Sequence, residues 1–95
     1  MRIQFTGNMF EWRGPSPFYF VRVPDGEAAR IAEVSSMVTY GWGVIPVTVT
    51  VGATTATTSL FPKDGGYLVP IKNSVRLPEE LSVGDIVDVT LAIAV

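Results

Sequence analysis

Apolar and polar residues alternate most regularly in the middle of the chain. Three valines alternate with threonines before Gly52-Ala53, and a similar alternation resumes after it. A period of two is typical of a strand with one buried face. A two-residue turn at Gly52-Ala53, with glycine supplying a positive φ angle, would pair Val51 with Thr54 and Val49 with Ala56. The pattern therefore predicts a hairpin with one aliphatic face and one threonine-rich face.

Two strands are predicted before this hairpin. Ile3, Phe5 and Met9 occupy odd positions whereas Phe10 and Trp12 occupy even ones, so we expect a β-bulge near residues 7–8 that re-aims the inward face. Residues 18–23 are apolar at both odd and even positions, which favours a strand buried on both sides.

A helix and two further strands complete the pattern. Helical spacing of apolar residues after Pro24 predicts a helix over residues 25–38. A turn at residues 63–66 leads to a strand over residues 67–71, in which Pro70 removes a ladder donor and indicates an edge or a bulge. Residues 73–76 suit a single helical turn, and alternating aliphatic residues from Val87 predict the last strand.

These elements favour one architecture. Six short strands and one helix, without alternation of strands and helices, predict a mostly-β fold: a small closed or nearly closed six-stranded β-barrel with a short helix at about 25–38 covering one end. Closure removes the exposed strand edges that so small a sheet would otherwise present. With 95 residues, the chain is expected to form a single domain, residues 1–95.

Composition narrows the possible chemistry. The chain has no His and no Cys, which excludes catalytic triads built on them and removes the usual transition-metal ligands. Asp85 and Asp88 are an odd number of residues apart on a predicted strand, so they cannot act as a carboxylate pair. A nucleophilic Ser59 would need a buried Lys72 as its base, which we do not expect. We expect no metal, no cofactor and a non-catalytic role.

The uncharged stretch over residues 34–62 is long enough to span a membrane, but Gly, Pro and strand-like alternation interrupt it. We therefore expect a soluble hairpin and no membrane partner. The first residues carry no apolar segment typical of a secretory signal, and the chain lacks Cys, so a cytoplasmic location is expected. Seven basic and nine acidic residues give a net charge of −2, which disfavours nucleic acid as a partner.

An ordered set of aromatic, glycine and aliphatic motifs runs along nearly the whole chain. Its most specific part is Ser59-Leu60-Phe61-Pro62 followed by Tyr67-Leu68-Val69-Pro70-Ile71-Lys72 and Val75-Arg76; its other members are Trp12, Phe18-Tyr19-Phe20, Gly41-Trp42-Gly43, Thr54-Thr55, Thr58 and Gly84-Asp85-Ile86-Val87. In these residues the chain resembles the bacterial domain-of-unknown-function family 1905.

The resemblance implies a small six-stranded barrel without a settled activity. In that family the barrel occurs alone or is followed by a segment of bacteriocin-protection type, and this chain resembles the stand-alone form. It differs from many members at Ala56 and Thr57, where they carry a large aromatic followed by a basic residue.

Six residues are candidates for a binding site. Lys72 and Arg76 lie four apart across a predicted helical turn, where they could hold a carboxylate or phosphate, or could pair with Glu79, Glu80 or Asp64. Trp12 and Tyr19 could form a stacking wall with the guanidinium of Arg13 nearby, although such aromatics more often belong to the core. Trp42, between two glycines, suits a lid or a ring tucked under a tight loop.

Two functions from different classes remain open. The first is a binding barrel whose aromatic pocket and basic residues accept a small anionic ligand. The second is a module for protein interaction or self-association through the hairpin face or an edge near Pro70, which would make a homo-oligomer. A third, a barrel for single-stranded nucleic acid, is disfavoured by the acidic balance.

Overall fold

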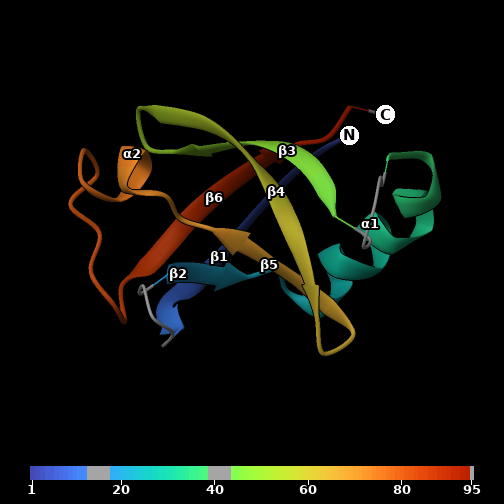
Figure 1. Cartoon of the computed structure of the whole chain (residues 1–95), viewed down its shortest axis with the longest axis horizontal. Helices are drawn as coiled ribbons and strands as arrows, with labels where there is room; N and C mark the ends of the chain where they lie inside the picture. Colours follow the sequence, from blue (N-terminus) through green and yellow to red (C-terminus); the bar gives the residue numbers. More distant parts are fainter. Residues whose placement is uncertain (13–17, 39–43, 95) are drawn as a thin grey trace.

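The protein is a closed β-barrel. The computed structural model describes residues 1–12, 18–38 and 44–94, and this part of the chain forms six strands and two helices. The strands are β1 (Arg2–Trp12), β2 (Phe18–Arg22), β3 (Ile45–Val51), β4 (Thr54–Lys63), β5 (Gly66–Pro70) and β6 (Ile86–Ala92); the helices are α1 (Asp25–Val38) and α2 (Asn73–Arg76). The strands pair antiparallel in the order β1-β2-β5-β4-β3-β6, and β6 closes onto β1 (Figure 1). The predicted fold class and the helix over residues 25–38 are confirmed.

The central hairpin has the predicted register. Val51 pairs with Thr54 and Val49 with Ala56, and Gly52 has a φ of 57°. The valines of β3 are buried, whereas the threonines on the outer face of the hairpin are partly or fully exposed: Thr48, Thr50, Thr55 and Thr57. The turn residue and the alternation of apolar positions were sufficient to set this register.

Two strands each serve two neighbours. β1 pairs with β6 through residues 2–8 and then with β2 through residues 9–12. β4 pairs with β3 through residues 54–60 and then with β5 through residues 61–63. Because each of these strands changes partner along its length, six short strands suffice to close the barrel.

The β-bulge predicted near residues 7–8 is absent, and that prediction was wrong. The register of β1 is continuous against each partner, and Ile3, Phe5 and Met9 are all buried at odd positions on both sides of residues 7–8. Phe10 and Trp12 lie instead on the outer face, where both contact Phe20, with ring centroids 6.1 and 6.4 Å apart. The apparent change of parity reflects a second apolar cluster outside the barrel.

The expectation that β2 is buried on both faces was also wrong. Val21 points into the barrel and is fully buried. Phe18 and Phe20 have the opposite parity and face outward, and Phe18 is 59% exposed. In β2, apolar residues on both faces therefore mean that the outer wall of the barrel is apolar, and not that the strand is internal.

The barrel interior is filled by aliphatic side chains. Most come from inward positions of the strands, and α1 adds Ala28 and Ile31 at one end of the barrel (Figure 1). Interiors of small barrels are commonly filled in this way. In the described part of the chain, no helix is long and apolar enough to cross a membrane.

Pro70 occupies the edge position expected from its missing N–H. Pairing of β4 with β5 ends at Phe61 and Leu68, so Pro70 lies beyond the last pair on that side. On its other side β5 still pairs with β2, and the N–H of Ile71 bonds the carbonyl of Tyr19. Beyond Pro70 the chain turns into α2, the helical turn predicted over residues 73–76.

Gly7 provides a test of the point where β1 changes partner. A Cβ at this position would lie 2.7 Å from Cγ1 of Val21, which is fully buried and cannot move freely. We expect Gly7→Ala to lower the free energy of unfolding by about 1–3 kcal/mol, as overpacking usually does. Urea denaturation measures this change.

The matched control is Gly26→Ala in the first turn of α1, where a Cβ would meet nothing within 4 Å. Alanine has the higher helix propensity, so this variant should be as stable as the original or gain up to about 1 kcal/mol. Equal stability of both variants would contradict the close approach of β1 to β2.

Candidate functional site

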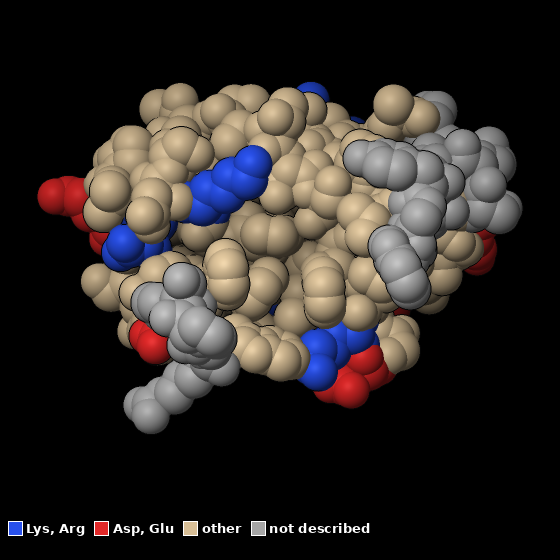
Figure 2. Space-filling model, in the orientation of Figure 1, with Lys and Arg blue, Asp and Glu red and all other residues tan. Residues whose placement is uncertain are grey.

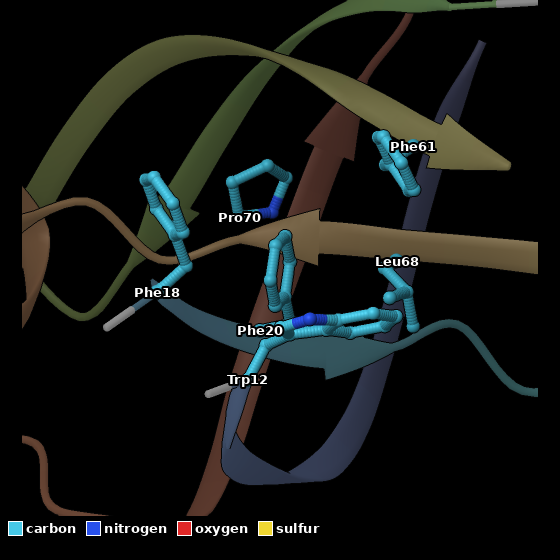
Figure 3. A pocket seen from close by; sticks show the side chains of 6 residues that line it. All are labelled: Trp12, Phe18, Phe20, Phe61, Leu68 and Pro70. Atoms are coloured by element: carbon cyan, nitrogen blue, oxygen red, sulfur yellow. The ribbon is translucent and has the colours of Figure 1, made fainter. Parts of the chain in front are cut away.

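An apolar groove lies on the outer wall of the barrel, over β2 and β5. It encloses about 490 Å³ and is lined by Trp12, Phe18, Phe20, Phe61, Leu68 and Pro70 (Figure 3). These residues come from β1, β2, β4 and β5, and in Figure 3 their side chains project to the same side of the sheet. The volume is within the range of pockets that hold small molecules. We call this feature the apolar groove.

Leu68 forms the floor of the apolar groove. It is only 2% exposed, yet it does not belong to the cluster that fills the barrel interior. Its neighbours on the outer face bury it. The aromatic walls are more open, with Trp12 39%, Phe61 49% and Phe18 59% exposed. A buried floor beneath partly exposed aromatic walls is typical of a surface that binds a ligand or another protein.

A second, more polar hollow adjoins the apolar groove. It encloses about 260 Å³ and is lined by Phe18, Tyr19, Pro70, Ile71, Lys72 and Asn73. Phe18 and Pro70 line both features, so a molecule in the groove can extend past them into this polar hollow.

Lys72 and Arg76 supply positive charge at the polar hollow. Lys72 Nζ donates to the carbonyl of Thr57 at 2.8 Å, which leaves its other two N–H groups available. The Arg76 guanidinium lies 4.5 Å from the ring centroid of Tyr19, and its Nε and Nη2 donate to Oδ1 of Asn73 at 3.2 and 3.0 Å. Tyr19 thus makes a cation–π contact with Arg76 and lines the polar hollow together with Lys72.

The alternative ion pairs are not formed within the described residues. Glu79 accepts a hydrogen bond from Thr54 Oγ1 instead, and neither Glu80 nor Asp64 contacts Lys72 or Arg76. The carbonyl of Lys72 accepts the backbone N–H groups of Val75 and Arg76, so α2 is anchored by its own backbone. Both cationic side chains thus keep donors for another acceptor.

Positive charge also lies at the other end of the apolar groove. Lys63 Nζ is 4.2 Å from the ring centroid of Trp12. The guanidinium of Arg22 donates to the carbonyls of Lys63 and Asp64 at 3.1 and 3.2 Å, which holds the turn between β4 and β5. Figure 2 shows basic side chains at separate places around an uncharged central surface, with acidic side chains beside the basic ones at the left and lower edges.

The structure brings four of the six candidate residues to this region. Lys72 and Tyr19 line the polar hollow, Arg76 lies over Tyr19, and Trp12 lines the apolar groove. The other two candidates, Arg13 and Trp42, lie outside the described residues.

Sequence reasoning missed the groove residues Phe18, Phe61 and Leu68, and the flanking Lys63. The available signal was parity. Apolar residues at the outward positions of β2 and β5 are unexpected for a barrel wall that faces water, because such walls normally alternate. Lys63 had no such signal, since the residues that follow it have the composition of a turn.

The described residues contain no group of three or more acidic, His or Cys side chains that could hold a metal ion. The groove offers a stacking and packing surface, and the lysines and arginines offer hydrogen bonds to an anion.

The fold and the groove define the protein as a small closed β-barrel with an apolar groove on its outer wall. Residues 5–91 match the family model described as Domain of unknown function (DUF1905), so the chain belongs to this family, as its motifs indicated. A search of curated proteins and a search of solved structures each found no match.

Leu68 tests whether the outer cluster is a packed part of the fold. We expect Leu68→Ala to lower the free energy of unfolding by about 2–4 kcal/mol, as truncation of a buried leucine does, although the side chain lies outside the barrel. The control is Leu77→Ala, because Leu77 is 60% exposed. That variant should change stability by less than about 0.5 kcal/mol. Chemical denaturation that gives equal effects would contradict a packed groove floor.

Proposed function

We propose that this protein is a non-catalytic binding module for a small ligand that has an apolar body and an anionic group. The observation that carries the proposal is the junction of the apolar groove with the polar hollow. Phe18 and Pro70 belong to both, and the hollow holds Lys72 with unused donors. An amphipathic anion could then place its body over Leu68 and its charge beside Lys72 and Arg76.

The two parts of the site would contribute differently. Each methylene group buried in the groove is worth about 0.8 kcal/mol. An ion pair with an exposed lysine is usually worth no more than about 1 kcal/mol. The groove would therefore supply most of the affinity, whereas the cations would select anions and orient them.

A binding role also agrees with the absence of His and Cys from the sequence. It has no His or Cys to serve as a base or nucleophile near neutral pH. Asp88 lies on β6, whereas Asp85 lies in the loop before it and accepts a hydrogen bond from the N–H of Ser82. We place the protein in the bacterial cytoplasm, with neither nucleic acid nor membrane as its partner.

The test compares two molecules with the same number of carbon atoms, one that ends in a carboxylate and one that ends in a neutral hydroxyl. Octanoate should raise the melting temperature and bind in isothermal titration calorimetry, and octanol should bind more weakly. Substituting Lys72→Gln together with Arg76→Gln should remove the preference for octanoate. Lys72 is exposed, Arg76 is partly buried beside Tyr19, and neither makes an ion pair in the described residues. The ligand-free stability should therefore change by no more than about 1 kcal/mol.

Arg30→Gln is the matched control, since Arg30 is exposed on α1, a helix that contributes no residue to the lining of the apolar groove or of the polar hollow. This variant should keep the preference for octanoate. Loss of the preference in the control, or its survival in the double variant, would contradict the assignment of Lys72 and Arg76.

Self-association is the second candidate, and the exposure of Phe18 and Phe61 favours it. Two copies could cover their grooves with each other. Sedimentation would then show a mass that rises with concentration and returns to that of the monomer in Phe18→Ser. A constant monomer mass with octanoate binding would support the ligand-binding function instead.

A further inference from the structure

We infer that the ligand of this site is an elongated molecule with an anionic group at each end and an apolar body between them. The inference rests on the proposed function and adds a second anchor to it. The observation behind it is that cations flank the apolar groove at both ends, Lys72 and Arg76 at one and Lys63 at the other.

Lys63 is placed by the fold and is not a freely moving surface side chain. Its backbone pairs with Gly66, and its carbonyl accepts a hydrogen bond from Arg22. Its ammonium group rests over Trp12, one of the residues that line the apolar groove. Because Lys63 is held against a wall of the apolar groove, its ammonium N–H groups can donate hydrogen bonds to a molecule in the groove.

The end of the apolar groove near Lys63 has a net positive charge when the turn at residues 63–66 and Arg22, which is bonded to it, are counted together. Lys63 and Arg22 are cationic, and Asp64 is the only acidic residue among residues 63–66. In the described residues Lys63 forms neither a hydrogen bond through Nζ nor an ion pair. No carboxylate of the described chain therefore occupies the position that a ligand anion would take.

The spacing of the two ends sets the shape of the ligand. Lys63 pairs with Gly66, and Lys72 follows Gly66 by six residues of nearly continuous extended chain. At about 3.3 Å per residue, the two backbone positions are about 20 Å apart. Contacts hold both ammonium groups, that of Lys63 over Trp12 and that of Lys72 on the carbonyl of Thr57. The ligand that reaches both is therefore elongated and not a compact dianion.

The groove between the ends suits an uncharged body. All six residues that line it are apolar or aromatic, and Leu68 closes its floor. A linear molecule with charge in its middle would leave that charge unpaired against these side chains, which is unfavourable. The arrangement therefore selects charge at the ends.

The experiment compares linear diacids with monoacids of equal length: octanedioate with octanoate, dodecanedioate with dodecanoate, and hexadecanedioate with hexadecanoate. One diacid of suitable length should bind up to about fivefold more tightly than its monoacid, which is the factor that one exposed ion pair can supply. The advantage should shrink as salt is added, because exposed charges are screened.

Lys63→Met should remove the advantage of the diacid while monoacid binding remains, because methionine keeps an apolar side chain beside Trp12. Arg30→Gln serves again as the control. Salt dependence on the unmodified protein provides a second measurement that does not require a variant to fold: the affinity for the diacid should fall more steeply with salt than that for the monoacid.

Each outcome decides one of the two proposals. Monoacid binding without any advantage for a diacid would overturn the second anchor and leave the proposed function standing. An advantage that persists in Lys63→Met would also overturn the second anchor. Failure of every monoacid and every diacid to bind would overturn the proposed function itself.

Discussion

The structure depends on closing a hydrogen-bonded barrel with strands that change partner along their length. β1 leaves β6 for β2 after Asn8, and β4 leaves β3 for β5 after Leu60. At the first change, Gly7 allows the closest approach of β1 to Val21. The second halves of both strands then carry Trp12 and Phe61 on the outer wall beside β2 and β5. The groove is thus a product of the same geometry that closes the barrel.

The location of the groove follows from the size of the barrel. Six strands enclose a space that Val, Ile and Leu side chains fill, so the interior is committed to packing. An apolar ligand must then bind outside, and the outer wall needs its own buried floor and aromatic sides. Leu68 and Phe20 provide that second apolar layer, with Arg22 and Lys63 fastening the turn at one end.

The sequence alone was sufficient to predict an element where neighbouring residues determine its structure. Alternating valines and Gly52 predicted the register of the hairpin, and spacing after Pro24 predicted α1. It was insufficient where two apolar faces overlapped on one strand. Phe10 and Trp12 were interpreted as inward residues after a bulge, and β2 as an internal strand, because parity assigns a side chain to a face and not to a partner. Lys63 depends on a contact with Trp12, distant in sequence, that no local pattern encodes.

β5 is joined to each of its neighbours by only three residue pairs, whereas seven pairs join β1 to β6 and seven join β3 to β4. The groove lies across these two short seams, and its walls are drawn from the strands on both sides of each. Any molecule held there would bridge two of the three seams that have only three residue pairs each. It would therefore tie β5 to both of its neighbours and oppose the local separation of these strands.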